Sequence, residues 1–133
     1  MSDRILVLAT VVLAIADGIL HLALDIVLFR GRFFLNELSV LFLLNFVGYL
    51  VLAGLFLFSG RLLGSRAWLV NLLLAVYALT AIVMWAQRGG PNPLNLGYAS
   101  KALEVLLLVA VAAHWWLTQH SRSQSREPQR LSA

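Results

Sequence analysis

The feature that most constrains the fold of this chain is a set of four long apolar segments. They cover residues 5–29, 38–58, 67–86 and 98–117. A helix of about 20 apolar residues crosses the roughly 30 Å hydrocarbon core of a bilayer. Apolar residue types make up 61% of the chain, whereas soluble domains contain about 45–50%. The sequence therefore predicts an integral membrane protein whose main partner is the lipid bilayer.

Short polar connections separate the four segments, at residues 30–37, 59–66 and 87–97. Connections this short make neighbouring helices run in opposite directions. We therefore expect an all-α protein with one domain over residues 1–118, which is a four-helix antiparallel transmembrane bundle. Residues 119–133 are rich in Ser, Gln and Arg and have few apolar side chains, so they are predicted to form a disordered, basic cytoplasmic tail.

The distribution of arginine predicts the orientation of the bundle. The side that holds both termini carries six Arg residues, which are Arg4, Arg61, Arg66, Arg122, Arg126 and Arg130. The other side carries three, which are Arg30, Arg32 and Arg88. Cytoplasmic connections are enriched in Lys and Arg, so both termini are expected in the cytoplasm and the chain in the cell (inner or plasma) membrane. Because this bias explains the basic pI of about 10.4, no nucleic-acid partner is expected.

Ionisable side chains inside the apolar segments are the main functional signal. Asp17, His21 and Asp25 are spaced i, i+4, i+8 and share one face of the 5–29 segment. Lys101 and Glu104 are three residues apart in the 98–117 segment, close enough to pair along a helix. A charged side chain at membrane depth costs about 2.5–3.5 kcal/mol on insertion scales and is kept where it has partners or a function.

Two further polar residues, Asn45 and Tyr49, share a face of the 38–58 segment. The predicted topology places Asn45 with His21, Asp25, Lys101 and Glu104 in the outer half of the membrane, and Asp17 and Tyr49 near its middle. All seven are therefore candidate residues of an ion or proton site, or of a polar pocket.

Other kinds of chemistry find little support in the sequence. The chain has no Cys, which excludes thiolate metal sites, iron–sulfur clusters and Cys nucleophiles. Asp17 and Asp25 are separated by about 12 Å along a helix, too far for one ion to bind both, although Glu104 could join two neighbouring ligands. No phosphate loop, nucleophile elbow or zinc-protease pair appears. We therefore predict no catalytic, metal or cofactor-binding residues.

Three functions fit this pattern. The first is a non-catalytic accessory subunit or homo-oligomeric membrane component, in which the polar residues order the outer half and the partners are other membrane subunits or further copies of the chain. The second is a small proton- or cation-coupled transporter, since burial disfavours the charged form of a carboxyl group and this suits proton relay. The third is a membrane-embedded enzyme acting on lipid-like substrates, with His21 as general base and Asp25 orienting it.

Overall fold

The chain folds into four long helices in a computed structural model. The backbone is described for residues 3–30, 32–34, 36–90, 92 and 95–131, and side chains are described as far as His120. The helices are α1 (Asp3–Phe29), α2 (Glu37–Leu63), α3 (Trp68–Gln87) and α4 (Leu96–Leu131), with a short 3₁₀ turn, η1 (Gly64–Arg66), between α2 and α3. Each long helix contains a stretch long and apolar enough to cross a membrane. The predicted all-helical fold with four apolar spans is confirmed.

Two helices extend further than the apolar segments predict. Helix α2 continues to Leu63 through residues assigned above to a connection, and ends where Gly64 takes a positive φ of 51°. A glycine tolerates that conformation because it has no Cβ. Helix α4 continues to Leu131, through the region where the composition predicted disorder. Extending an existing helix avoids the cost of nucleation, and the Gln, Arg and Glu residues of this region are good helix formers.

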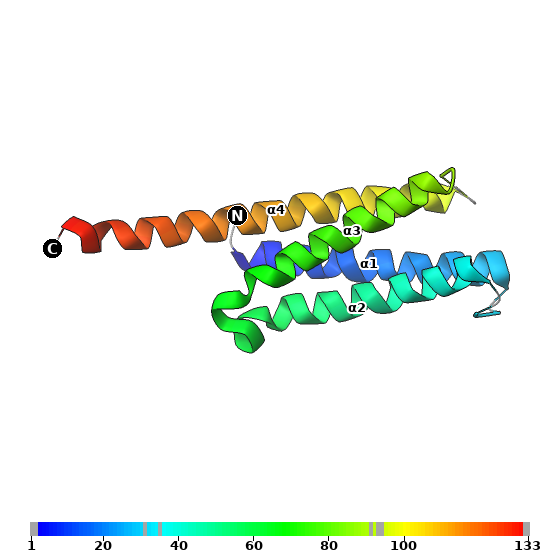
Figure 1. Ribbon diagram of the computed structural model, residues 1–133, viewed down its shortest axis with the longest axis horizontal. Helices are drawn as coiled ribbons and strands as arrows, with labels where there is room; N and C mark the ends of the chain where they lie inside the picture. The colour runs from blue at the N-terminus through cyan, green and yellow to red at the C-terminus, as the bar shows by residue number, and fades with distance from the viewer. Residues whose placement is uncertain (1–2, 31, 35, 91, 93–94, 132–133) are drawn as a thin grey trace.

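Consecutive helices run in opposite directions, so the connections lie at two ends of the bundle (Figure 1). We call the end with the α1–α2 and α3–α4 connections the loop end. The opposite end, which holds the start of α1 and the α2–α3 connection, is the tail end. Helix α1 packs most extensively against α2 and then α4, whereas α2 and α3 share the smallest interface of the neighbouring pairs. Helix α3 crosses the bundle obliquely in Figure 1.

Gly18 and Asn36 contribute to the contact between α1 and α2 and to the start of α2. A Cβ added to Gly18 of α1 would lie 3.2 Å from the carbonyl oxygen of Phe46, so a glycine allows α2 to approach at this level. The α1–α2 connection ends at Asn36, whose Oδ1 accepts a hydrogen bond from the backbone N–H of Ser39 at 3.0 Å. This bond satisfies one of the unpaired N–H groups at the start of α2. Gly18 therefore permits the close contact between α1 and α2, and Asn36 caps the start of α2.

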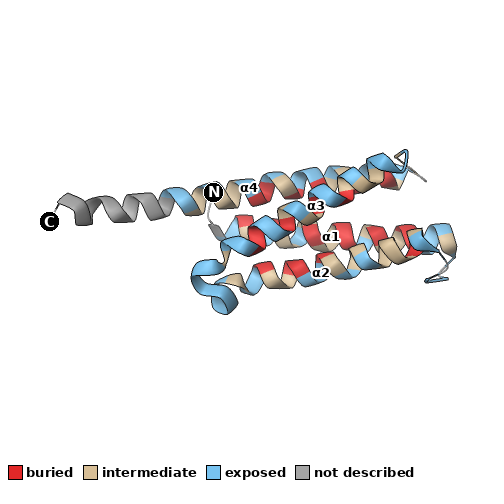
Figure 2. Cartoon of the chain, in the orientation of Figure 1, coloured by how far each residue is buried: buried red, intermediate tan, exposed pale blue. Residues whose placement is uncertain are grey.

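Apolar packing fills the middle and tail end of the bundle, where buried positions line the inner faces of the helices (Figure 2). This core consists of Ala14, Tyr49, Leu52, Ala53, Phe56, Val70, Leu74, Ala78, Leu107 and Val111. Of the buried polar residues, Asp17, His21, Asp25, Ser39, Ser100 and Glu104 lie toward the loop end, whereas Thr10 and Asn71 lie toward the tail end. Most of the buried polar side chains, including all the buried carboxyl groups among the described residues, are therefore in the loop half.

Candidate polar site and adjoining cavity

Five polar side chains from α1 and α4 meet in the interior of the loop half. Asp17 and His21 come from α1, and Ser100, Lys101 and Glu104 come from α4. We refer to these five residues as the polar cluster. The side chains of Asp17 and Glu104 have no exposed surface, and that of His21 is 4% exposed. Since α1 and α4 pack against each other, residues 83 positions apart in sequence come into hydrogen-bond contact.

Lys101 and Glu104 form the strongest charged contact of the polar cluster. The Nζ atom of Lys101 donates to Oε1 of Glu104 at 2.5 Å and to Oε2 at 2.6 Å. The two residues are one helical turn apart, at i and i+3, as their spacing predicted. Both oxygens of Glu104 are therefore engaged by the single ammonium group of Lys101, whose side chain is 13% exposed.

Asp17 is held by Ser100, and its backbone in turn orients His21. The Ser100 hydroxyl donates to Oδ1 of Asp17 at 2.8 Å. Nδ1 of His21 donates to the backbone carbonyl oxygen of Asp17 at 3.0 Å. A carbonyl oxygen only accepts, so Nδ1 carries the hydrogen and Nε2 of the neutral ring has a free lone pair. This Nε2 lies 3.9 Å from Oε1 of Glu104, which is near but beyond hydrogen-bond distance.

The polar cluster is not a closed hydrogen-bond network. Oδ2 of Asp17 is buried and has no partner among the described residues. The hydroxyl of Tyr49, from α2, is also buried and has no hydrogen-bond partner among the described residues. A buried acceptor without a donor costs free energy, about 1–3 kcal/mol for a neutral group and more for a charged one. Oδ2 can therefore take up a proton without losing a hydrogen bond.

The charges of the polar cluster also indicate that it takes up a proton or a cation. The polar cluster contains two carboxyl groups, on Asp17 and Glu104, and one ammonium group, on Lys101. With His21 neutral, two ionised carboxylates would leave one uncompensated negative charge in a site surrounded by apolar helices. Such a charge is costly without a partner. The neutral state of the polar cluster thus holds one additional proton, on a carboxyl group or on Nε2 of His21, or one bound cation.

The polar cluster also contains three residues of the types that bind metal ions. Asp17, His21 and Glu104 each offer a ligand atom, and these atoms lie within 4.8 Å of one another. This is the combination that helix geometry permits: two neighbouring ligands from one helix and a third from another. The ammonium group of Lys101, however, already contacts both oxygens of Glu104. A metal ion could use Glu104 only after Lys101 moved away, so the geometry favours a proton site.

Asp25 does not take part in the polar cluster. It is fully buried, and neither of its oxygens has a hydrogen-bond partner among the described residues. The third hypothesis, in which Asp25 orients His21 as a general base, does not fit this geometry, because His21 is oriented by the backbone of Asp17. The reason is local, since the ring turns back along α1 to the carbonyl group four residues before it.

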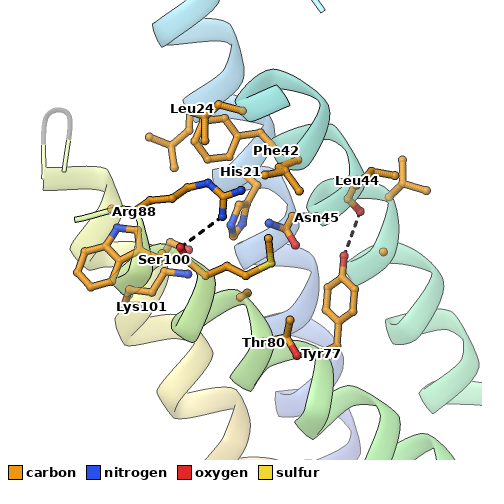
Figure 3. Close-up of a pocket in the computed structure, with 18 of the residues that line it drawn as sticks. His21, Leu24, Phe42, Leu44, Asn45, Tyr77, Thr80, Arg88, Ser100 and Lys101 are labelled. Carbon is orange, nitrogen blue, oxygen red and sulfur yellow. Dashed lines mark hydrogen bonds between the residues drawn. The ribbon is translucent and has the colours of Figure 1, made fainter. Parts of the chain in front are cut away.

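A cavity of about 480 Å³ adjoins the polar cluster at the loop end (Figure 3). Small-molecule sites in proteins commonly measure about 300–1,000 Å³. All four helices contribute to the walls, and most of the lining side chains are apolar. The polar side chains that line it are His21, Asn45, Tyr77, Thr80, Arg88, Ser100 and Lys101. Of the seven predicted residues, His21 and Lys101 belong to the polar cluster and also line the cavity, and Asn45 lines the cavity alone. Asp17 and Glu104 belong to the polar cluster but lie behind the cavity wall. Tyr49 lies in the core beside them, and Asp25 lies apart from both cavity and cluster.

Three polar residues of this region were not singled out as site residues in the sequence. Ser100 lies four residues before Glu104, on the same helix face, and that spacing was the available signal. Tyr77 donates to the backbone carbonyl of Leu44 at 3.1 Å and bridges α3 to α2. Arg88 extends beside the cavity in Figure 3 and donates to the carbonyl of Met84 at 3.4 Å. The positions of Tyr77 and Arg88 depend on the oblique path of α3, which no local pattern encodes.

No protein-family model, curated protein or solved structure matches the chain.

Proposed function

We propose that this protein is a small proton-coupled transporter of the cell membrane. In this proposal its four apolar helices cross the bilayer and both termini lie in the cytoplasm, as the excess of Arg at the tail end favours. The loop end, with the polar cluster and the cavity, then faces outward. The proton carriers are Asp17, Glu104 and His21.

One observation supports the proposal more than any other: the groups that hold the buried carboxyls also form the wall of the cavity. His21, Ser100 and Lys101 all line the cavity. Ser100 and Lys101 bind the side chains of Asp17 and Glu104, respectively, and His21 binds the backbone of Asp17. A molecule in the cavity would contact these three residues and so change how strongly each carboxyl group is stabilised.

Coupling follows from this arrangement by charge balance. The polar cluster is neutral with one additional proton. A bound molecule that takes over the hydrogen bond of Ser100, or the ion pair of Lys101, leaves a buried carboxylate without its partner. That carboxylate must then gain a proton, because an unpaired buried charge is costly. Ligand binding and proton binding therefore affect each other equally, as linkage between two sites requires.

The test is flux in proteoliposomes that contain a luminal pH indicator. Anionic, cationic and neutral amphiphiles are added outside, and empty liposomes correct for passive permeation. We expect a protein-dependent change of luminal pH with at least one of these compounds, which Asp17→Asn abolishes. Glu37→Gln is the matched control, because Glu37 is an exposed acid at the start of α2 and should leave the flux unchanged.

Two results would overturn the proposal. One is folded, correctly inserted protein that gives no pH change with any compound. The other is extraction in mild detergent together with larger subunits at a fixed ratio. That second result would instead support the accessory subunit that the sequence also predicted, and the polar cluster would then serve assembly.

A further inference from the structure

The cavity has an opening on the side of the bundle, between α2 and α3. These neighbouring helices share the smallest interface, and α3 diverges from α2 toward the loop end (Figure 1). Leu44 and Val47 of α2 and Thr80 of α3 all line the cavity, and all three are exposed on the surface of the bundle. If the helices span a bilayer, this opening faces lipid rather than water. A molecule would then enter from the hydrocarbon phase.

Most of the cavity lining is apolar, and none of its polar side chains carries a negative charge. Neither Asp nor Glu is among the lining residues, whereas Arg88 and Lys101 are. The Lys101 ammonium is compensated by Glu104. Arg88 forms no salt bridge with any carboxylate among the described residues, and its guanidinium group donates a hydrogen bond to the backbone carbonyl of Met84 in α3. The excess charge at the cavity wall is therefore positive.

Asn45 adds a neutral group to this region. It lines the cavity opposite Arg88 in Figure 3, and its side chain has no hydrogen-bond partner within the described part of the chain. An amide supplies two N–H donors. Apolar walls with a few convergent donors are the usual composition of a site for a largely apolar ligand with one polar group.

We propose that the cavity binds an amphipathic anion, with its apolar chain in the opening between α2 and α3 and its head group held by Arg88 and Asn45. This assignment rests on the proposed function and names its substrate class. A guanidinium group pairs well with carboxylate, sulfate or phosphate oxygens because several of its N–H donors lie in one plane. The anion also lies within the cavity that Lys101 lines, where it competes with Glu104 for the ammonium group. Glu104 then takes up one proton, and the total charge of the site is unchanged.

The binding experiment uses Trp85, which lines the cavity, as its reporter. Trp68, Trp115 and Trp116 are replaced by Phe, so that quenching of Trp85 by a brominated ligand reports occupancy. The probes are a brominated long-chain alkyl sulfate, the alcohol of the same chain and the trimethylammonium compound of the same chain. All three partition into the detergent micelle, so a saturable difference between them measures the site and not the partitioning.

We expect the sulfate to bind at least about tenfold more tightly than the alcohol and the trimethylammonium compound to bind weakest, because hydrogen bonds to charged groups are among the stronger ones. Arg88→Gln should reduce the sulfate affinity about tenfold and leave that of the alcohol within about twofold. Arg88→Lys, which keeps the positive charge, should retain part of the affinity. Arg61→Gln, at an exposed arginine in the last turn of α2, should have no effect.

Equal affinity for the three probes, quenching that does not saturate, or an unchanged sulfate affinity in Arg88→Gln would overturn this assignment. Unchanged binding of the alcohol shows that the Arg88→Gln variant is folded, so loss of sulfate binding cannot be attributed to unfolding. The results also distinguish failure of the proposed proton coupling from failure of the proposed ligand class. Saturable sulfate binding without proton uptake would refute proton coupling and keep the ligand class. Proton-coupled flux of some other compound, without sulfate binding, would refute the ligand class alone.

Discussion

The ion pair between Lys101 and Glu104 offers the most direct test of the polar cluster. Lys101→Met removes the ammonium group that donates to both oxygens of a fully buried carboxylate, at 2.5 and 2.6 Å. Removing one partner of a buried ion pair costs about 3–5 kcal/mol, because the other charge is left unpaired. Two carboxyl groups, those of Asp17 and Glu104, would then lie in the interior without a cation among the described residues of the polar cluster. We therefore expect about 3 kcal/mol of lost stability at pH 8.

The loss should depend on pH in a defined direction. In Lys101→Met the buried carboxyls favour protons in the folded state more than in the unfolded state. The folded state then binds more protons than the unfolded state, so the free energy of unfolding falls as the pH rises. The destabilisation relative to the unaltered protein should thus be smaller at pH 5 than at pH 8. Unfolding of the helices by sodium dodecyl sulfate in mixed micelles, followed by circular dichroism, measures both values.

The double variant Lys101→Met with Glu104→Gln is the decisive control. It removes both charges, so no carboxylate at position 104 remains unpaired, and most of the lost stability should return. The two single variants should therefore be non-additive by more than about 1 kcal/mol, as expected for residues in direct contact. Additive effects, or a Lys101→Met variant within about 1 kcal/mol of the unaltered protein at pH 8, would refute the charge-balance argument.

Two further predictions concern packing and the separate carboxyl group. Gly48→Ala should destabilise the bundle by about 1 kcal/mol, because the added Cβ would overlap the hydroxyl group of Tyr77, which must then move and lose its hydrogen bond to the carbonyl of Leu44. Gly54→Ala, in the same helix but with open space at its Cβ, should be neutral or stabilising in the same unfolding assay; equal effects of the two changes would contradict this geometry. Asp25→Asn should raise the free energy of unfolding at pH 8 by about 1–3 kcal/mol, because it replaces a buried ionisable group that has no partner among the described residues with a neutral amide of the same shape. A loss of stability in Asp25→Asn would instead point to a partner from another chain.

Much of the fold follows from the sequence. Long apolar segments can avoid unpaired backbone groups in hydrocarbon only as helices, so segment length alone predicts the number of spans. Spacing on one helix was equally informative. Asp17 and His21 at i and i+4, and Lys101 and Glu104 at i and i+3, interact in the structure. These contacts depend on helix geometry, which is the same in every fold.

The tertiary structure decided which of these residues meet and what lies beside them. Asp17 joins Ser100 of another helix, whereas Asp25, on the same face of α1, is left without a partner among the described residues. The difference arises because α1 and α4 come together at the level of Asp17, and sequence patterns do not set the relative height of two helices. The cavity depends in the same way on the oblique crossing of α3, which side-chain packing such as that of Tyr77 over Gly48 determines. Local residue choice therefore specifies the helices and the faces of their polar residues, and only packing between helices determines whether those faces form a site.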